Sequence, residues 1–467
     1  MIGLCIQDLA DIVGGRLRLA DMPPLGGASE PVRRVVLHVD EVQPGDVLLA
    51  LPNSAASQPG AVEAAYARGA CGVIAAGRPL APWPGAFSID VDDAAWTLWQ
   101  LARALRQGFD KTVIGVAGPV GKTTTAAMIA AVLDQPFAAA PPAPGAHEEQ
   151  VAAQLLSLDE RQRAAVIELP ATSHGQFDAQ LHLACPQVGV LTSPGGPQET
   201  TSAAGMAHDF DPAADLLSAL PDDGALVLDQ HAARRTQAVE RLKNCLTFGR
   251  EASCDVSATH VLCEPGRLSF VVDGQLVRLP VWGRSHLNSA LAAWCVGRQL
   301  GIADATIAAR LANYRAPAGT CRVTSVADVA VIENSGAGST QATSAALELL
   351  GEFSAPGRRI VLVDRIGAQA HYDDAAADEF GRQAVVLGGA DAVLASGTHR
   401  QKICEAAARH GVPASACKAF DALAESVSYA AQIVQAGDVV LLQGVDGAEV
   451  QRLLAAMQFR KNDRQAA

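Results

Sequence analysis

Short runs of consecutive apolar residues alternate along this chain with alanine-rich segments in which apolar residues recur every three or four positions. The runs include AAVIEL at 164–169, VGVLTS at 188–193, RRIVLVD at 358–364 and DVVLLQG at 438–444. Such runs are typical of strands buried on both faces of a parallel sheet, and the segments between them predict covering helices. The pattern predicts an α/β protein.

The same pattern divides the chain into three expected domains, since 467 residues exceed what one hydrophobic core usually holds. Residues 1–109 contain a strand, helix and strand (GDVLLAL, AVEAAYARGA, CGVIAA) and end near the helix DAAWTLWQLARALRQ. Residues 110–315 open on the strand VIGVA and close with the helices NSALAAWCVGRQLG and ADATIAARLANY. Residues 316–467 repeat the strand and helix alternation of a doubly wound sheet.

Composition and charge exclude several classes of protein. A hydrophobic content of 49% with 18% charged residues is that of a packed globular protein. The net charge of −13 argues against nucleic acid or an anionic membrane surface as a general partner. No apolar stretch approaches the roughly 18 residues of a membrane span, no secretory signal is visible, and the ten cysteines form no C-x-x-C pair. We therefore expect a cytoplasmic protein with reduced thiols and no membrane insertion.

The stretch VIGVAGPVGKTTT at 113–125 predicts a strand, a glycine-rich turn and a helix that together bind phosphate. Gly118 and Gly121 allow backbone amides to approach phosphate oxygens, and the following helix directs its positive end at the same place. Lys122 would neutralise the terminal phosphates of a nucleotide, Thr123 would offer its hydroxyl to Mg²⁺, and Thr124 would complete the nucleotide site. The spacing is shorter than G-x-x-x-x-G-K-[ST], and an ordinary strand-to-helix turn containing a lysine is the alternative.

An ordered set of motifs resembles the Mur ligase superfamily, most closely its members that add D-alanyl-D-alanine to UDP-N-acetylmuramoyl-tripeptide. The motifs are VQPGDVLLAL, AGPVGKTTT, the strand that ends in Glu168, LPDDGALVLDQ, TFGRE, WGRSHLNSALAA and GDVVLLQG. No string except the phosphate loop is specific alone, but their order covers nearly the whole chain. The resemblance implies a substrate-binding domain, a central P-loop ATPase-like domain and a C-terminal Rossmann-like domain.

The resemblance also implies a reaction and its residues. In these ligases ATP phosphorylates a substrate carboxylate, and an amine then displaces the phosphate to form an amide. Lys122 matches the loop lysine of the family, and Glu168, with Thr123, would hold Mg²⁺; a solvated strand end is the alternative for Glu168. Arg322 matches the arginine that approaches the γ-phosphate. Asn288 would lie on the adenine side if the motif is shifted by one residue.

Several family motifs are altered where polar side chains would meet substrates. Ser193 and Gln198 stand where the family has an asparagine and a metal-binding histidine, and Ala213 stands where it has a lysine. The family's G-x-H-N-x-x-N corresponds to GRSHLNS at 283–289. In the first domain, HVD at 38–40 replaces D-S-R, and SQPGA replaces a D-G-H loop.

The last domain departs from the family in two further motifs. The stretch ENSGAGST, which begins at Glu333, replaces D-D-x-Y-N-A-N-P. Residues 443–446, with the sequence QGVD, replace K-G-S-R, so both cations of that motif are lost. Asp364, in VLVDRIG, is retained.

Two main functions remain open on this evidence. The first is an ATP- and Mg²⁺-dependent amide ligase that joins a small carboxylate to an amine, with altered substrates and a weakened site. The second is a catalytically silent relative that binds nucleotide for regulation or assembly, and a nucleotide-driven switch is a third. Because the losses fall on polar positions and spare the hydrophobic pattern, diverged function is favoured over a lost fold.

Overall fold

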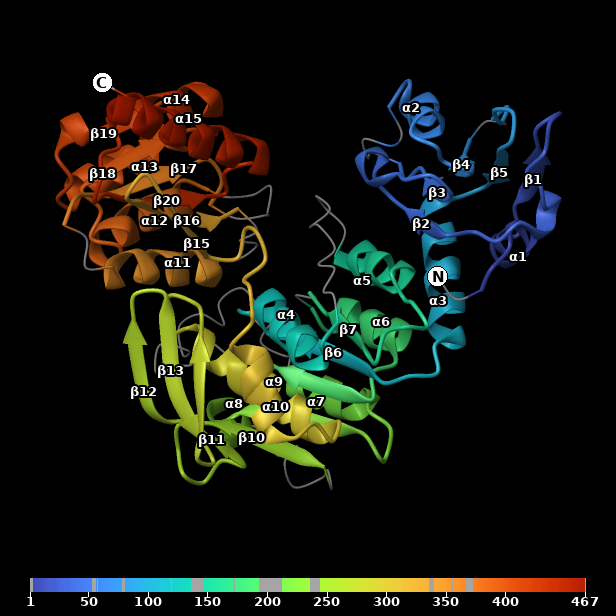
Figure 1. The fold of residues 1–467 in the computed structure, drawn as a ribbon, viewed down its shortest axis with the longest axis horizontal. Helices are drawn as coiled ribbons and strands as arrows, with labels where there is room; N and C mark the ends of the chain where they lie inside the picture. Colours follow the sequence, from blue (N-terminus) through green and yellow to red (C-terminus); the bar gives the residue numbers. More distant parts are fainter. Residues whose placement is uncertain are drawn as a thin grey trace. The chain divides into compact units, whose positions relative to one another are not determined.

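The computed structural model describes residues 3–52, 56, 58–77, 80–118, 120–135, 147–170, 173–192, 212–235, 244–335, 340–353, 356–366 and 373–466. The fold is α/β, as the apolar pattern predicts (Figure 1). Two compact units form: Met1–Val116 with Gln135–Gly189 and Asp209–Gly224, and Ala117–Asp134 with Val190–His208 and Ala225–Ala467. No helix among the described residues is long and apolar enough to cross a membrane.

The first unit begins with a five-stranded sheet in the order β1-β5-β4-β3-β2. Its strands are β1 (Arg16–Leu19), β2 (Arg34–Val36), β3 (Asp46–Leu49), β4 (Gly72–Ala76) and β5 (Phe87–Val91), all parallel except β1. The helices are α1 (Ile6–Val13), α2 (Ala61–Ala67) and α3 (Ala94–Gly108). The carboxylate of Asp93 caps α3 by accepting hydrogen bonds from the amides of Ala95 and Trp96, which fixes where this predicted helix begins.

The central sheet has six strands in the order β11-β10-β9-β8-β6-β7. They are β6 (Val113–Ala117), β7 (Ala165–Glu168), β8 (Val188–Leu191), β9 (Ala225–Asp229), β10 (Cys245–Gly249) and β11 (Val256–Ser257). The helices of this part of the chain are α4 (Lys122–Leu133), α5 (His147–Leu156), α6 (His174–Ala184), α7 (Pro212–Ala219), α8 (Gln230–Arg235), α9 (His286–Gln299) and α10 (Asp304–Leu311). The apolar runs at 164–169 and 188–193 form β7 and β8, as predicted.

A three-stranded antiparallel sheet was not anticipated from the sequence. It consists of β12 (Thr259–Glu264), β13 (Arg267–Val272) and β14 (Gln275–Leu279). Asp273 and Gly274 join β13 to β14 with φ values of 46° and 78°. An Asp-Gly pair between two alternating strands is a strong hairpin signal, so the sequence did contain the information.

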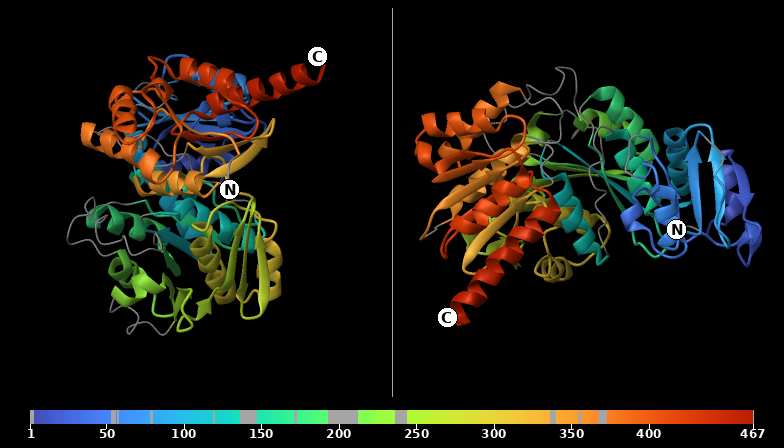
Figure 2. Two further views of the ribbon diagram at one scale, coloured as in Figure 1. Left: turned by 90° about the vertical axis from the view of Figure 1, so that its left-hand side faces the viewer. Right: turned by 90° about the horizontal axis from the view of Figure 1, so that it is seen from above.

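The C-terminal sheet has the order β15-β16-β20-β17-β18-β19. The strands are β15 (Arg322–Val326), β16 (Val329–Asn334), β17 (Arg359–Val363), β18 (Ala392–Ala395), β19 (Cys417–Ala419) and β20 (Val439–Gln443). The helices are α11 (Thr340–Glu352), α12 (Asp374–Val386), α13 (Arg400–Arg409), α14 (Leu423–Ile433) and α15 (Gly447–Ala466). Helices cover both faces of this sheet (Figure 2).

Alternation of side chains along the parallel strands divides the C-terminal core into two layers. In β17, Val361 and Val363 pack with residues of α11, α12 and α13, whereas Ile360 and Leu362 pack with residues of α14 and α15. Because both faces of β17, β18 and β20 are buried, these three strands are almost entirely apolar, and their polar residues lie at the strand ends. This is the doubly wound arrangement predicted for the last third of the chain.

Candidate active site

The phosphate loop connects β6 to α4 and has the backbone conformation that its glycines permit. Gly118 has a φ of +126° and Gly121 a φ of +78°, and α4 begins at the next residue, Lys122. A Cβ atom on Gly118 would lie 2.3 Å from the carbonyl oxygen of Thr192. Glycine is therefore required at 118, since a side chain would fit neither the backbone angle nor the space.

Hydrogen bonds hold this loop in place on both sides. Thr192 donates its hydroxyl to the carbonyl of Val120 at 2.6 Å, and its amide donates to the carbonyl of Ala117 at 2.8 Å. The ammonium of Lys122 donates to the carbonyl of Gly118 at 2.8 Å. The lysine thus reaches back across the turn that precedes it, where a bound phosphate would meet both the cation and the first amides of α4.

Helix α9 supports the first turns of α4. The hydroxyl of Thr125, which is buried, donates to the hydroxyl of Ser289 at 2.9 Å. Further along, Gly297 allows close approach, because a Cβ there would lie 2.9 Å from the side chain of Val132. Ser289 therefore makes this contact; Asn288, one residue earlier, is rotated by roughly 100° around the helix. The adenine role of Asn288 stays a prediction.

The residues of the loop fit a nucleotide with Mg²⁺. Lys122, Thr123 and Thr124 occupy the first turn of α4 and are all half-buried. Among the described residues, no three His, Cys, Asp or Glu side chains gather in a way that could hold a metal alone. Mg²⁺ usually takes one or two protein ligands and fills its shell with substrate phosphates and water, so this donor set matches Mg²⁺ bound with a nucleotide.

Glu168 ends β7, in register with Val116 of β6. Its backbone is held by the amide of Gln154, which accepts from the Glu168 N–H at 2.7 Å and donates to the Glu168 carbonyl at 3.0 Å. Gln154 is 5% exposed and lies on α5. Sequence reasoning missed this positioning residue, because nothing in the local pattern links α5 to β7.

Arg322 begins β15 and pairs with Glu333 of the neighbouring β16. The guanidinium contacts the Glu333 carboxylate at 2.7 Å, and Glu333 itself is 5% exposed. The arginine therefore neutralises the buried carboxylate of Glu333. Its predicted role at the γ-phosphate, like the catalytic roles of Lys122 and Glu168, stays a prediction.

The altered positions 193, 198 and 213 fall in two places. Ser193 and Gln198 lie outside the described residues. Ala213 is 3% exposed on α7, so a small apolar residue is packed where the family has its lysine.

His286, in the altered adenine-side motif, is buried at the start of α9. Its Nδ1 atom has no hydrogen-bond partner among the described residues. Burial lowers the pKa of the imidazole to about 4, although the carbonyls of Gly283 and Trp282 partly oppose this. The ring is therefore neutral at pH 7, and the folded protein resists protonating it.

We expect His286 to make the protein sensitive to mild acid. The unfolded chain binds this proton near pH 6.5, so stability is complete above that pH and falls as the pH drops toward about 4. Between pH 7.5 and pH 5, wild type should lose about 2 kcal/mol more than His286→Asn. Urea unfolding of both proteins at the two pH values measures this; equal losses would contradict it.

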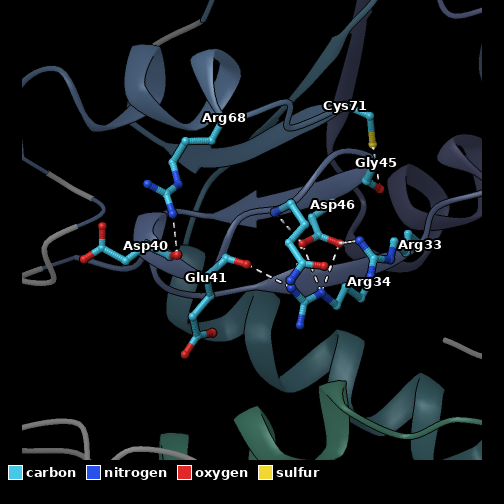
Figure 3. A network of polar contacts seen from close by, with 9 residues as sticks. Arg33, Arg34, Asp40, Glu41, Gly45, Asp46, Arg68 and Cys71 are labelled. Carbon is cyan, nitrogen blue, oxygen red and sulfur yellow. Dashed lines mark hydrogen bonds and ion pairs between the residues drawn. The ribbon is translucent and has the colours of Figure 1, made fainter.

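A network of polar contacts surrounds a buried carboxylate in the five-stranded sheet (Figure 3). Asp46 is 0% exposed; it accepts from the Nε of Arg34 at 3.0 Å and from the amide of Gln43 at 2.9 Å. Arg34 also donates to the carbonyl of Glu41 at 2.9 Å, and Arg68 donates to the carbonyl of Asp40 at 2.6 Å. The Asp of the V-x-P-G-D motif thus ties β2, β3 and the turn between them together.

Replacing Asp46 with alanine should destabilise the protein by about 2 kcal/mol. The change removes charged hydrogen bonds worth about 1.5–3 kcal/mol each, but Arg34 is partly exposed and regains water. Glu41→Ala is the matched control, because Glu41 contributes its backbone carbonyl to the network, and its cost should stay within about 0.5 kcal/mol. Chemical denaturation of both variants distinguishes them, and equal costs would refute the assignment.

Comparison with known proteins supports the class indicated by fold and motifs. Residues 321–445 match the family described as Mur ligase, glutamate ligase domain. The MurF ligase of Thermotoga maritima, solved in complex with ADP, has the same fold, with a TM-score of 0.63 at 22% identity over 93% of this chain and 99% of that one. The chain thus contains a Mur ligase domain at residues 321–445, and it is similar to Mur ligases over most of its length.

The chain is similar in sequence to ligases that add D-alanyl-D-alanine. It is 30% identical over 341 residues to the UDP-N-acetylmuramoyl-tripeptide–D-alanyl-D-alanine ligase of Mycobacterium bovis, covering 67% of this chain and 66% of that protein, just under two thirds. It is 26% identical over 422 residues to the enzyme of the same name from Escherichia coli, covering 87% of this chain and 88% of the relative.

Proposed function

We propose that this protein is an ATP-dependent amide ligase of the Mur type that acts on a peptidoglycan precursor in the cytoplasm. The observation that carries the proposal is the intact phosphate loop. Gly118 has the conformation and close contact that only glycine allows, α4 begins at the loop lysine, and Thr192 clamps the turn. The ADP complex of the Thermotoga relative and the activity named for the bacterial relatives support the same reaction.

Each residue has a distinct role in this reaction. ATP with Mg²⁺ supplies the phosphoryl group that activates the substrate carboxylate. Lys122 and the first amides of α4 bind phosphate oxygens and stabilise the negative charge that builds on them. Thr123 and Glu168 would hold Mg²⁺, and Asn288 would contact the adenine side. Arg322 would approach the γ-phosphate while remaining paired with Glu333.

The names of the relatives and the altered motifs of this chain together suggest the acid and amine substrates. The bacterial relatives are named for UDP-N-acetylmuramoyl-tripeptide and D-alanyl-D-alanine. In this chain HVD at 38–40 replaces the D-S-R motif. We propose a related carboxylate and amine, with weaker binding of the standard muramoyl tripeptide.

Phosphate release with both standard substrates saturating tests the proposal. We expect turnover slower than about 1 s⁻¹, because the loss of one electrostatic stabiliser costs about 10²–10³ in rate and several are absent here. Release should require the acid, the amine and ATP together. Phosphate release that is equal with and without the amine would favour the alternative of a nucleotide-hydrolysing switch.

A further inference from the structure

Polar residues lie at, or just after, the carboxyl ends of three neighbouring parallel strands of the C-terminal sheet. Asn334 is the last residue of β16, Gln443 is the last of β20, and Arg365 follows β17 by two positions. These strands are neighbours in the order β16-β20-β17. Doubly wound sheets bind ligands at the carboxyl ends of their strands, so this edge is where the fold itself favours a ligand.

Two buried amides occupy the positions where the family motifs have opposite charges. Asn334 stands at the second aspartate of D-D-x-Y-N-A-N-P, and Gln443 stands at the lysine of K-G-S-R. The Nδ2 of Asn334 donates to the Oε1 of Gln443 at 2.7 Å, and the two residues are 3% and 0% exposed. Because Asn334 and Gln443 are both neutral, neither residue leaves an unpaired buried charge. The loss of the negative charge at 334 is thus matched by the loss of the positive charge at 443.

The amide pair fixes the turn that follows β17. The Nε2 of Gln443 donates to the carbonyl of Arg365 and to the hydroxyl of Thr343, both at 3.3 Å. The hydroxyl of Thr343, also buried, donates to the carbonyl of Ile366 at 2.8 Å. The backbone carbonyls of Arg365 and Ile366 are therefore both held from the core, which limits where the Arg365 side chain can begin.

The side chain of Arg365 lies against the glycine at the centre of the altered K-G-S-R motif. Its Nε donates to the carbonyl of Gly444 at 3.2 Å, and a Cβ on Gly444 would lie 2.1 Å from the Arg365 carbonyl oxygen. The side chain is 63% exposed. The guanidinium of Arg365, just after β17, thus supplies a cation beside the turn from which two cations are missing.

The neighbouring Asp364 forms a long ion pair with this guanidinium but no hydrogen bond to it. The carboxylate of Asp364 is 3.9 Å from the Nε of Arg365 and accepts instead from the hydroxyl of Ser396 at 2.7 Å. Among the described residues, none accepts a hydrogen bond from the Nη atoms of Arg365. The planar guanidinium belongs to a side chain that is 63% exposed, and its donors have the arrangement that matches carboxylate and phosphate oxygens.

We propose that Arg365 binds the oxyanion of a ligand at this edge, in place of the cations lost at 443 and 446. The inference rests on the proposed function, which supplies two oxyanions: the carboxylate of the amine substrate and the terminal phosphate of ATP. Asn334 and Gln443 are positioning residues that hold the arginine's backbone. The amine carboxylate is the expected ligand, since the phosphate loop already provides a cation for the nucleotide.

Calorimetric titration of the full chain tests this, with and without a non-hydrolysable ATP analogue and Mg²⁺. The probes are D-alanyl-D-alanine, D-alanine and L-alanine, each also as its carboxamide. Wild type should bind at least one carboxylate about 10-fold or more tightly than its carboxamide. Arg365→Gln should remove this preference, because its affinity for the carboxylate should fall about 10- to 100-fold. Arg365→Lys should retain part of it, and Arg382→Gln, on α12 in an ion pair with Glu379, should retain it all.

Each outcome decides between the two oxyanions or overturns the proposal. If Arg365→Gln weakens the ATP analogue instead of the carboxylates, the bound oxyanion is the nucleotide phosphate. If Arg365→Gln changes the affinity neither for the carboxylates nor for the ATP analogue, Arg365 binds no oxyanion. The same conclusion follows if wild type prefers no carboxylate to its carboxamide and Arg365→Gln binds the ATP analogue with wild-type affinity. Wild type that binds no nucleotide would defeat the proposed function, while the titrations without nucleotide would still decide the role of Arg365.

Discussion

Replacing Lys122 with alanine will reduce ATP affinity about 10- to 100-fold and ligation about 10³-fold while leaving the fold intact. The ammonium is the strongest charge at the loop, and hydrogen bonds to charged groups contribute about 1.5–3 kcal/mol each. Alanine is the best helix former, so α4 should still begin at this residue. Calorimetric titration with ATP and Mg²⁺ measures the first effect, and phosphate release measures the second.

Lys111→Ala is the control for this prediction. Lys111 stands just before the amino end of β6, whereas Lys122 follows its carboxyl end, and Lys111 bonds the carbonyl of Glu160. Removing Lys111 deletes the same charge from the chain without touching the loop, so ATP affinity should be unchanged. Equal loss in the two variants would mean that net charge, rather than the loop, governs nucleotide binding.

Gly118→Ala should have the second large effect, on stability and on nucleotide binding together. The new Cβ would lie 2.3 Å from the carbonyl oxygen and 2.4 Å from the hydroxyl of Thr192, at a φ of +126° that alanine rarely adopts. Relief requires the loop to move away from Thr192, which breaks its contact with Val120. We expect a loss of about 3 kcal/mol in unfolding free energy and no measurable ATP binding.

Gly175→Ala provides the comparison for this variant. Gly175 lies in the first turn of α6, and a Cβ there would meet nothing within 4 Å. This substitution should be neutral or stabilise the protein by about 0.5–1 kcal/mol, because alanine favours the helix. Guanidinium unfolding and ATP titration of both variants give the answer. A Gly118→Ala protein with wild-type stability and wild-type ATP affinity would show that the loop does not have the described conformation.

Local motifs made much of this protein predictable. The strand, loop and helix from 113 to 133 follow from a few neighbouring residues, because glycines, a buried strand and an alanine-rich helix each specify their own conformation. The same holds for the strands β17, β18 and β20, whose burial on both faces favours apolar residues everywhere except at the strand ends. The pattern analysis missed the hairpin between β13 and β14, although the Asp-Gly pair at 273–274 predicts it.

The contacts that adapt the altered motifs could not be predicted, since they join residues far apart in the sequence. Ser289 bonds Thr125 across 164 positions, and Arg365 bonds Gly444 across 79. Each depends on how helices and strand ends pack, which local patterns do not specify. Motif comparison alone identified the positions as lost; the structure adds that Asn334 and Gln443 pair with each other.

The substitutions have two different consequences for the site. Ala213 is packed in the core, so its position no longer offers any polar group. Arg322, by contrast, keeps a charged partner in Glu333. The losses need not add, because catalytic groups that act as a unit are strongly non-additive. A slow ligase is therefore the expected result.

Transfer of ¹⁸O from the substrate carboxylate to phosphate tests the ligase account most directly. The acid is labelled in its carboxylate and incubated with the protein, ATP, Mg²⁺ and the amine, with Lys122→Ala in parallel. If the carboxylate is phosphorylated and then attacked by the amine, one labelled oxygen appears in the released phosphate for each amide formed. The account predicts this label for wild type and its near absence for Lys122→Ala. Unlabelled phosphate, or no phosphate above the level of the Lys122→Ala variant, would contradict it.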